Sequence, residues 1–363
     1  MARTGIITFD FFPFIGGIGR FTYTLYNELK SKDIIFFSPT VNTLDNHIHV
    51  NFWAVRFFKQ VGVSIWLLLH GKRIISEYRL DKLNIHAGPG GVLYIRKLPI
   101  PVFVTCHHTY WQQFTYIKSQ FWKRIFLPFE QRTYRLADRI ICDCEDTKRV
   151  LIERYDVPPG KITVIHCAVD TGKFHVVNLP EKPHCALYVG RIAKRKGIDF
   201  LICSMPYVVQ MIPDVQLLVG GKGTYLEKMK SLVRKLNLER NVSFLGFVPD
   251  DHLNTLYNQA QCVVVPSIFE GFGISVIEAL AAGKRVVGTN TDGIREILRN
   301  PDLGRLVPYG DTGALAEAIA AELNEPKRAG ALPPEYQLET LRNLYLEVLE
   351  GSPTSHQGSA HPS

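Results

Sequence analysis

Two glutamates flank a glycine-containing segment and are the first candidates for chemistry. Glu270 and Glu278 lie eight positions apart, which corresponds to a rise of about 12 Å in a helix. Retaining glycoside hydrolases hold their two carboxyl groups only about 5–5.5 Å apart, so this pair cannot act in that way. Carboxylates also accept hydrogen bonds from hydroxyl groups. We therefore expect the pair to bind the two ends of an extended ligand; the alternative is a solvated glutamate and an ordinary acid in the first turn of a helix.

The residues between the glutamates predict an anion site. A helix is expected from about Ile274 to Gly283, and the backbone amides of Phe272, Gly273 and Ile274 would point outward at its start. Unsatisfied N–H groups and the helix dipole attract phosphate to such a position. A nucleotide-diphosphate sugar has hydroxyl groups at both ends and a diphosphate between them, so it matches this pattern.

Further segments favour a phosphorylated ligand. Residues 190–197 read GRIAKRKG and follow a predicted strand. Their cations can offset the negative charge of a departing diphosphate. The alternative is that this run of Lys and Arg is only the solvated start of a helix. Two predicted loops, one with Gly16 and Gly17 and the other with Gly221, would let the protein backbone approach a phosphate or sugar closely. Neither loop reads GxGxxG, and the strands that follow do not end in the acid that holds a nicotinamide ribose. A dehydrogenase is therefore disfavoured.

A histidine pair follows another predicted strand. His107 and His108 come directly after residues 102–106, at the strand end where ligands of open α/β sheets bind. His107 could polarise or position a sugar hydroxyl or the acceptor, and a histidine at the edge of the core is the alternative. No Asp, Glu or Cys lies at a spacing suited to complete a metal site with the pair, so we expect no metal.

Short apolar runs alternate with longer helical patterns along the chain, which predicts an α/β fold with two Rossmann-like parallel sheets. We expect an N-terminal domain over residues 1–178 and a C-terminal domain over 179–334. A helix over 335–350 is expected to pack back on the first domain, and 351–363 to form a disordered tail. The strands are predicted at Gly5–Phe9, Ile34–Phe37, Asn84–His86, Val102–Thr105, Arg139–Cys142, Ile162–Ile165, Ala186–Val189, Gln216–Val219, Val242–Leu245, Cys262–Val265 and Arg285–Gly288.

With these motifs, the chain resembles family 4 retaining glycosyltransferases of the GT-B fold, in which two Rossmann-like domains face each other across a cleft. The resemblance extends over nearly the whole chain, from Gly16-Gly17 to Leu306-Val307, and is strongest in the second domain. It implies transfer with retention of the anomeric configuration, without a protein nucleophile, and without a metal or other cofactor.

The resemblance also implies roles for individual residues. Glu270 would contact hydroxyls of the donor hexose, and Glu278 would hold the ribose. The departing diphosphate would be stabilised by a set of cations, glycines and loop amides, and the reacting sugar would lie beside one histidine. These residues are Arg191, Lys196, Gly16, Gly17, Gly190, Gly221, Phe272, Gly273 and Ile274 for the phosphates, and His107 for the sugar.

The charge of the chain is uneven. Its 363 residues carry a net charge of +8, yet the first 178 hold 23 basic and 14 acidic side chains and all four tryptophans. Residues 51–100 contain eight Lys or Arg but only Glu77 and Asp81, interleaved with aromatic residues such as Trp53 and Phe57. A basic, aromatic face on the acceptor domain suits a peripheral membrane enzyme, unless the aromatic rings form the core and the cations are merely solvated.

Global features restrict the class of protein. An apolar content of 46% and a charged content of 21% exclude a disordered chain. The seven scattered cysteines form no CxxC pair, which favours reduced thiols in the cytosol. No run of about 18 apolar residues could span a bilayer, and the start of the chain has a strand pattern rather than that of a signal peptide. We expect a cytoplasmic protein, at the inner face of the membrane if the basic face binds lipid.

The sequence thus predicts a retaining hexosyltransferase. It would move a hexosyl group from a UDP- or GDP-sugar to a lipid-linked or glycan acceptor in the synthesis of cell-envelope polysaccharide or glycolipid. A nucleotide-sugar epimerase of the same fold is the alternative. A nucleic-acid-binding protein is less favoured, because the basic half contains no recognisable readout module.

Overall fold

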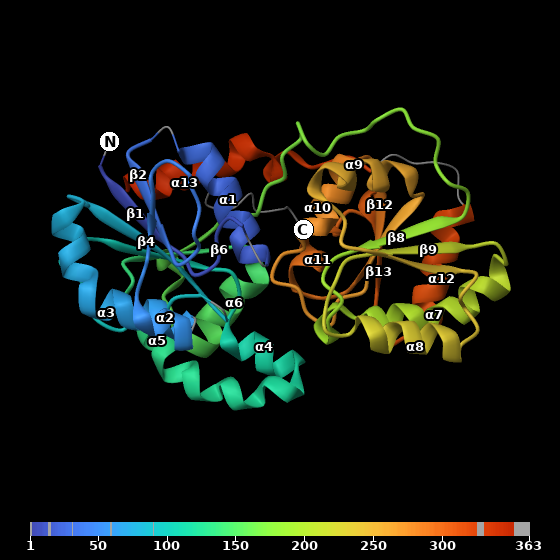
Figure 1. The fold of residues 1–363 in the computed structure, drawn as a ribbon, viewed down its shortest axis with the longest axis horizontal. Helices are drawn as coiled ribbons and strands as arrows, with labels where there is room; N and C mark the ends of the chain where they lie inside the picture. The colour runs from blue at the N-terminus through green and yellow to red at the C-terminus, as the bar shows by residue number, and fades with distance from the viewer. Residues whose placement is uncertain are drawn as a thin grey trace, which may run out of the picture. The chain divides into compact units, whose positions relative to one another are not determined.

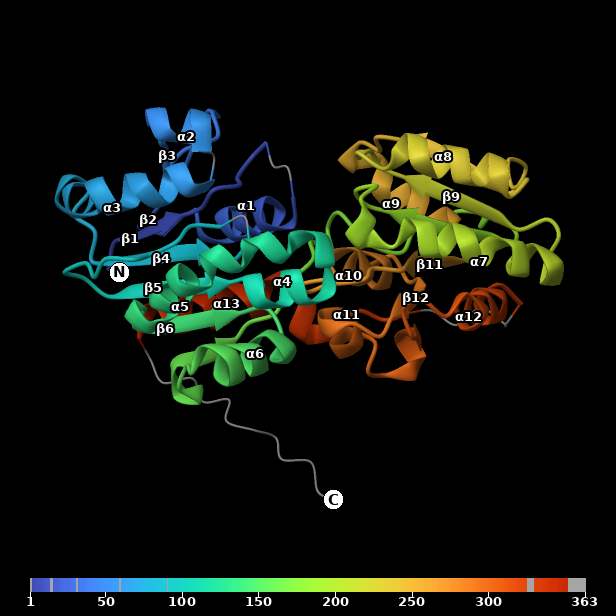
Figure 2. The same cartoon turned by 90° about the horizontal axis from the view of Figure 1, so that it is seen from below.

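A computed structural model describes residues 2–13, 16–30, 32–58, 60–89, 91–324 and 330–351. The chain divides into two compact units (Figures 1 and 2): unit 1 comprises Met1–Ala168 and Leu338–Ser363, and unit 2 comprises Val169–Gln337. Residues 352–363 of the predicted tail lie outside the described residues.

Unit 1 is built on a seven-stranded parallel sheet with the order β3-β2-β1-β4-β5-β6-β7. Its strands read as short apolar runs because both faces of the sheet are covered by helices. The strands are β1 Thr4–Ile7, β2 Ile34–Ser38, β3 His47–His49, β4 Lys82–Ala87, β5 Val102–Cys106, β6 Arg139–Cys142 and β7 Ile162–Val164. The helices are α1 Gly17–Leu29, α2 Trp53–Phe58, α3 Gln60–Glu77, α4 Tyr110–Tyr116, η1 Lys118–Phe126, α5 Leu127–Leu136, α6 Glu145–Tyr155, η2 Pro159–Lys161 and α13 Leu338–Glu350.

The two faces of this sheet are covered by different helices (Figure 1). Apolar side chains of α3, α5 and α6 form one buried cluster with the strands, while α1 and α13 pack together on the other face. Helix α13 brings the end of the chain back to this unit: Tyr345 is fully buried and its hydroxyl lies 2.6 Å from Oγ1 of Thr105 on β5. The helix is also tied to the sheet where Lys82 Nζ donates to the carbonyl of Leu349.

Unit 2 contains a six-stranded parallel sheet with the order β10-β9-β8-β11-β12-β13. Helices α7, α8 and α12 cover one face, and α9 and α10 lie over the other (Figure 1). The strands are β8 Cys185–Val189, β9 Gln216–Gly220, β10 Val242–Gly246, β11 Cys262–Val265, β12 Arg285–Thr289 and β13 Gly304–Val307. The helices are η3 Lys194–Lys196, α7 Ile198–Met211, α8 Leu226–Lys235, α9 Asp250–Gln259, α10 Ile274–Ala281, α11 Asp292–Ile297, η4 Pro301–Leu303, α12 Thr312–Asn324 and η5 Pro334–Tyr336.

The predicted fold class is confirmed, and every predicted strand is present with its ends shifted by at most two residues. Two strands were not predicted. Strand β3 is a three-residue edge strand that reads His-Ile-His, and β13 reads Gly-Arg-Leu-Val. Both are short and contain polar residues, so neither gives the apolar run that identified the other strands.

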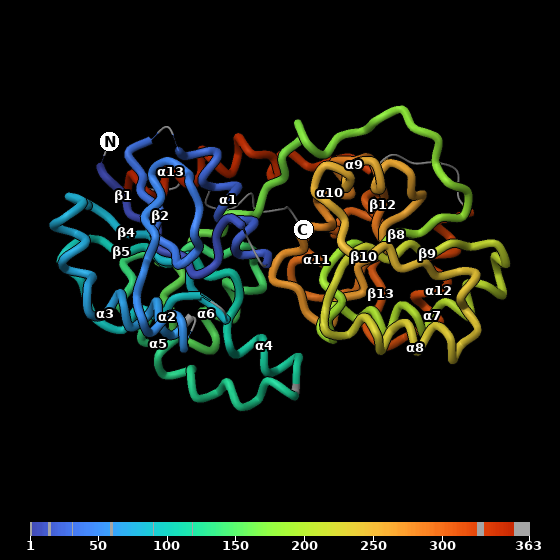
Figure 3. The backbone as a smooth tube through the Cα atoms, in the orientation of Figure 1, coloured from blue at the N-terminus to red at the C-terminus, as the bar shows by residue number. Residues whose placement is uncertain are grey.

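The change between units falls at Ala168, earlier than the expected boundary at residue 178. Figure 3 follows the chain across this point. Residues 169–178 belong to unit 2 because they are bound to it: Val169 forms a β-bridge with Gln337, and the Val177 amide donates to Asn258 Oδ1 at 2.8 Å. Residues 178–183, a mostly polar stretch that suits a linker by composition, are likewise attached to unit 2, since Glu181 pairs with the buried Lys284 at 2.7 Å.

Candidate active site

The topology of unit 2 brings two predicted site residues together. Lys196 lies in the loop after β8, and Glu270 lies in the loop after β11. These strands are neighbours in the sheet, and the strand order reverses between them. Ligands of doubly wound sheets bind at this switch point, outside the carboxyl ends of the strands.

The carboxylate of Glu270 is held in place by three side chains. Lys196 Nζ donates a short hydrogen bond to Oε2, Ser267 Oγ donates to the same oxygen at 3.1 Å, and Arg195 Nη1 lies 3.7 Å from it. The Arg195 guanidinium also donates to the carbonyl of Phe269 at 3.2 Å. Among the described residues, the contacts of this carboxylate all end on Oε2 and none ends on Oε1.

This arrangement keeps Glu270 ionised. Burial alone would raise its pKa, but the charges of Lys196 and Arg195 and the hydrogen bonds from Lys196 and Ser267 outweigh burial and lower the pKa to about 2. Burial lowers the pKa of Lys196, and the Glu270 carboxylate opposes that effect. A carboxylate charged at every physiological pH is an acceptor of hydrogen bonds and not a proton donor, which fits the binding of sugar hydroxyls.

Close backbone packing fixes the loops that carry these side chains. Gly197 has φ of +64°, and a Cβ at this position would lie 1.8 Å from the carbonyl oxygen of Pro266. Only glycine fits there, so the Lys196 loop can lie directly against the Glu270 loop. Gly221 has φ of +144° and would place a Cβ 1.9 Å from the carbonyl oxygen of Gly190. The predicted glycines Gly190 and Gly221 thus pack the loops after β8 and β9 together.

Glu278 is not a solvated acid. It is buried within α10, with 2% of its surface exposed, and its Oε2 accepts a hydrogen bond from the Tyr257 hydroxyl at 2.9 Å. Gly273 is the N-cap residue of α10 with φ of +114°, as expected for the start of this helix. Phe272 is buried against the ring of Tyr336, and Ile274 is half-buried.

Arg191 lies in the same loop as Lys196, but the structure separates their environments. Its side chain is exposed, and its backbone carbonyl accepts a hydrogen bond from Tyr188 Oη at 2.9 Å. The second cation beside Glu270 is Arg195, which was predicted only as part of the cationic segment 190–197 and not as a partner of the glutamate. The predicted action of Arg191 on a diphosphate stays a prediction.

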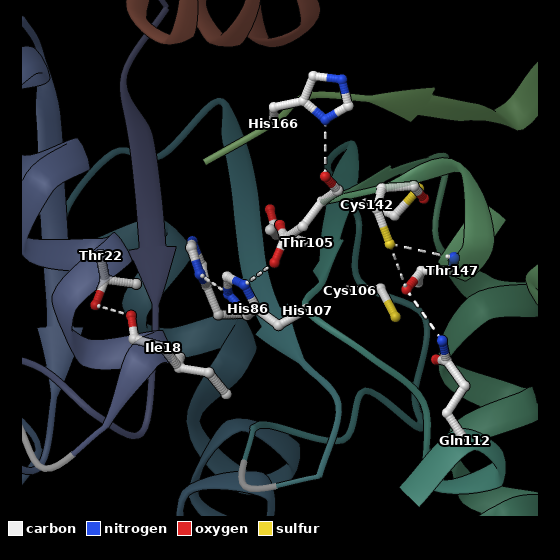
Figure 4. Close-up of polar contacts among 12 residues, drawn as sticks. Ile18, Thr22, His86, Thr105, Cys106, His107, Gln112, Cys142, Thr147 and His166 are labelled. Atoms are coloured by element: carbon white, nitrogen blue, oxygen red, sulfur yellow. Dashed lines mark hydrogen bonds and ion pairs between the residues drawn. The ribbon is translucent and has the colours of Figure 1, made fainter. Parts of the chain in front are cut away.

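In unit 1, His107 is buried rather than open to solvent. Only 4% of its surface is exposed, and both ring nitrogens have protein partners: Nδ1 lies 2.9 Å from Asp143 Oδ2, and Nε2 lies 3.0 Å from His86 Nδ1 (Figure 4). The ring of Phe21 on α1 meets His107 edge-on at 5.0 Å. The structure therefore shows His107 as the middle member of a buried row, and its expected contact with the reacting sugar stays a prediction.

The predicted glycine loop of unit 1 already has a carboxylate beside it. Gly16 is the N-cap residue of α1, and its amide donates to Asp10 Oδ2 at 2.9 Å. The Gly19 amide donates to the same oxygen at 3.1 Å. A Cβ on Gly17 would meet no atom within 4 Å. The start of α1 is thus capped by Asp10, and a phosphate placed near Gly16 would have to share these amides with that carboxylate.

Several partners in these sites were not predicted, and they differ in how far the sequence could have indicated them. Ser267 lies three positions before Glu270, and Arg195 is next to Lys196. Both therefore come close to Glu270 once the two loops are placed at adjacent strand ends. Tyr257 lies on a helix without a motif. His86 and Asp143 follow the pattern of polar residues at the ends of buried strands, which was a usable signal.

The described residues contain neither a cluster suited to a metal ion nor a helix suited to span a membrane. No group of three or more His, Cys, Asp or Glu among them is placed to hold a metal ion. None of the helices in the described ranges has the length and apolar character needed to cross a membrane.

Comparison with known proteins agrees with this fold. A family model described as Glycosyltransferase Family 4 matches residues 15–173, and one described as Glycosyl transferases group 1 matches residues 170–333. The chain belongs to the family 4 glycosyltransferases. Its similarity to solved structures shows the fold of GT-B glycosyltransferases.

Sucrose-phosphate synthase from Thermosynechococcus elongatus superimposes with a TM-score of 0.82 and 22% identity, over 97% of this chain and all of the other. HepE of Anabaena, solved with UDP and glucose, gives a TM-score of 0.74 and 16% identity over 96% of this chain and all of the other. Phosphatidyl-myo-inositol mannosyltransferase of Mycobacterium leprae is 38% identical over 146 residues, which are 40% of this chain and 38% of that protein. The chain spans less than two thirds of the length of the first curated relatives it matches, at 45%, 38% and 62%.

Proposed function

We propose that the protein is a retaining hexosyltransferase that uses a nucleotide-diphosphate sugar, UDP- or GDP-linked, and a lipid-linked or glycan acceptor in cell-envelope polysaccharide or glycolipid synthesis. The observation that carries the proposal is the ionised Glu270 carboxylate beside Lys196 and Arg195 at the switch point of unit 2. Family membership supports it, as does the presence of UDP and glucose in the HepE structure.

The proposed reaction breaks the bond between the anomeric carbon and the diphosphate oxygen and forms a bond to the acceptor hydroxyl oxygen on the same face of the sugar. The acceptor proton passes to the departing phosphate oxygen. Negative charge grows on the leaving group, and fixed cations near it stabilise the transition state. Arg191, Lys194, Arg195 and Lys196 are the cations available after β8, and we propose that they make a metal ion unnecessary. Glu270 would hold the hexose through Oε1.

The substitution Glu270→Gln tests this site. The donor is first identified by thermal shift with UDP, GDP, ADP and their sugars, because a ligand at 100 times its Kd adds about 2.7 kcal/mol of stability. Loss of a positioning contact at the reacting sugar should then lower transfer about 100-fold. Glu239→Gln, an exposed glutamate of the same unit, is the matched control and should keep full activity.

Several outcomes decide the proposal. Full activity of a folded Glu270→Gln variant would refute the site, and inversion at the anomeric carbon, read by NMR of the product, would refute retention. Conversion of the donor to an isomer without acceptor would instead establish the epimerase. Loss of transfer in the presence of a chelating agent would refute metal independence.

We also propose that unit 1 binds an anionic membrane surface, which would place the enzyme at the inner face of the cytoplasmic membrane. The aromatic rings of this half divide between core and surface: Trp66 and Trp111 pack against the buried cluster, whereas Phe57 on α2 is 76% exposed and Trp122 on η1 is 59% exposed. Further exposed apolar side chains lie on the same two helices. They are Trp53, Phe58, Phe121 and Ile125.

Charge complementarity favours an anionic lipid surface as the partner of η1. Lys123 and Arg124 lie in its last turn, and Arg124 stacks over the exposed Phe121 ring at 4.7 Å. Residues 118–126 contain no acid. Each cation near an anionic leaflet contributes about 1 kcal/mol, and insertion of the apolar side chains adds to it.

Vesicle sedimentation tests this surface. The wild-type protein should sediment with vesicles that contain phosphatidylserine, less so at high salt, and poorly with phosphatidylcholine alone. Replacing Phe121 and Trp122 by Ser should abolish sedimentation. The control replaces Tyr207 and Met211 on α7, which are 48% and 46% exposed in unit 2, and should sediment normally. Equal sedimentation of all three proteins would refute the proposal.

A further inference from the structure

Three titratable side chains form a buried row across neighbouring strands of unit 1. His86 lies on β4, His107 follows β5 and Asp143 follows β6, in the order of the sheet. His86 is fully buried, and His107 and Asp143 are 4% and 3% exposed. The rings of His86 and His107 lie side by side, joined through His86 Nδ1 and His107 Nε2 at 3.0 Å (Figure 4).

The donors and acceptors in this row can be assigned by elimination. His107 Nδ1 and Asp143 Oδ2 share a hydrogen bond at 2.9 Å, and with the carboxyl oxygen as the acceptor Nδ1 of His107 is the donor. Burial, followed by the neighbouring His107, lowers the pKa of His86 well below its usual value, so His86 is neutral and has a single N–H. The remaining question is which histidine donates in the contact between the two rings.

The unpartnered atoms answer this question. Nε2 of His86 is buried and has no hydrogen-bond partner among the described residues. If His107 donated, this nitrogen would carry a buried N–H without an acceptor, and such orphaned donors are rarer than orphaned acceptors. If His86 donates from Nδ1, its Nε2 is only an unused lone pair. The second arrangement is favoured, and it leaves His107 neutral with its proton on Nδ1.

We propose that His86 is a positioning residue that occupies Nε2 of His107 and, together with Asp143, fixes the orientation of its ring. Asp143 contacts Nδ1 of His107 and His86 contacts Nε2. The ring of Phe21 packs edge-on against the His107 ring, with the ring centres 5.0 Å apart. A free imidazole exchanges between two tautomers, whereas this one is held in a single form. The proposal rests on the proposed function, because His107 is the residue expected at the reacting sugar.

The row differs from ordinary packing because its contacts are polar and directional. The control lies on the same strand: Asn84 is as buried as His86 and also faces β5, but its side chain bonds Thr105 Oγ1 at 3.0 Å instead of His107. A substitution of Asn84 disturbs the packing of β4 and leaves the histidine contact in place. A substitution of His86 removes that contact.

The test combines a spectroscopic and a kinetic readout. Nitrogen-15 NMR of the histidine rings, without any ligand, should show His107 protonated on Nδ1 in the wild type and in His86→Asn, whose amide can donate in place of Nδ1–H. In His86→Leu the Nε2 signal of His107 should shift, because that nitrogen loses its hydrogen bond. Donor turnover should show kcat lowered about 10- to 100-fold in His86→Leu, with KM little changed, and restored in His86→Asn. Asn84→Leu should lose stability but keep the wild-type Nε2 signal of His107 and kcat.

Two results would overturn the proposal. One is an unchanged His107 Nε2 signal in His86→Leu, which would show that His86 does not occupy this nitrogen. The other is equal loss of kcat in His86→Leu and Asn84→Leu, which would reduce the role of His86 to packing. The NMR experiment needs no substrate, so it still decides whether His86 occupies Nε2 if the proposed transfer reaction fails.

Discussion

A buried carboxyl group in unit 1 makes the stability of that unit depend on pH near neutrality. Glu130 on α5 is fully buried and accepts hydrogen bonds from the Tyr110 amide to both oxygens at 3.0 Å, from Tyr134 Oη at 2.9 Å, and from Tyr155 Oη. Among the described residues, no Lys, Arg or His forms an ion pair with the Glu130 carboxyl group. The group thus joins α4, α5 and α6 without a compensating cation.

The pKa of Glu130 sets the size and the sign of the effect. Burial raises it from 4.5 to about 7, and the hydrogen bonds from Tyr155, Tyr110 and Tyr134 only partly oppose this. The folded state therefore holds the proton more tightly than the unfolded chain does. The stabilisation is complete below about pH 4.5 and is lost as the pH rises through about 7. At about 1.4 kcal/mol per pH unit, this interval corresponds to about 3 kcal/mol.

The substitution Glu130→Gln removes the titrating group and keeps its shape. All four tryptophans, Trp53, Trp66, Trp111 and Trp122, lie in unit 1, so urea unfolding followed by tryptophan fluorescence reports on that unit alone. Between about pH 4 and pH 8, the free energy of unfolding of the wild type should fall by about 3 kcal/mol relative to the variant.

Two further variants sharpen the test. Glu77→Gln removes an exposed carboxyl of the same unit, paired with Arg73 at 3.2 Å, and should keep the pH dependence of the wild type. Tyr155→Phe removes a donor that lowers the pKa of Glu130, so the loss of stability should occur at higher pH. A difference between wild type and Glu130→Gln that stays constant across this pH range would refute the reasoning.

Other substitutions follow from single contacts. Gly221→Ala should destabilise unit 2 by about 2 kcal/mol or more in thermal unfolding, because the new Cβ would lie 1.9 Å from a carbonyl oxygen and φ is positive. Gly310→Ala, where φ is +95° and no atom lies within 4 Å, should cost only about 1–2 kcal/mol. Tyr345→Phe should cost about 1 kcal/mol in fluorescence-detected unfolding of unit 1, because it removes the hydroxyl that contacts Thr105 Oγ1 and Asn84 Oδ1, while these two side chains still bond each other; an unchanged midpoint would contradict the assigned contacts.

The strands could be predicted because buried parallel strands leave a strong trace in the sequence. Cys262–Val265 reads Cys-Val-Val-Val and is buried at every position, and β-branched residues favour strands. No comparable pattern in the sequence marks the boundary between the two units. Residues 169–178 mix polar and apolar side chains, and what attaches them to unit 2 is a set of contacts with residues distant in the sequence, such as that of Val177 with Asn258.

The candidate site could be predicted at the level of loops but not of partners. Glu270 and Lys196 each lie after a predicted strand, so both could be placed at the carboxyl edge of the sheet, but their direct contact was not predicted. The partner of each atom depends on tertiary packing: Lys196 and Glu270 are 74 positions apart, and local sequence does not determine which of the neighbouring cations faces the carboxylate. For the same reason His107 could be placed at a strand end, while its burial between His86 and Asp143 could not.

One stretch of unit 1 connects the features that bear on function. His107 is held by His86 and Asp143, and three residues later the Tyr110 amide is held by Glu130 at the start of α4. Between them, Thr109 forms a capping box with Gln112. The exposed side chains of η1 begin only beyond this anchor. Because these two sets of buried hydrogen bonds lie between His107 and η1 along the chain, the lipid contact that we propose at η1 would not displace His107.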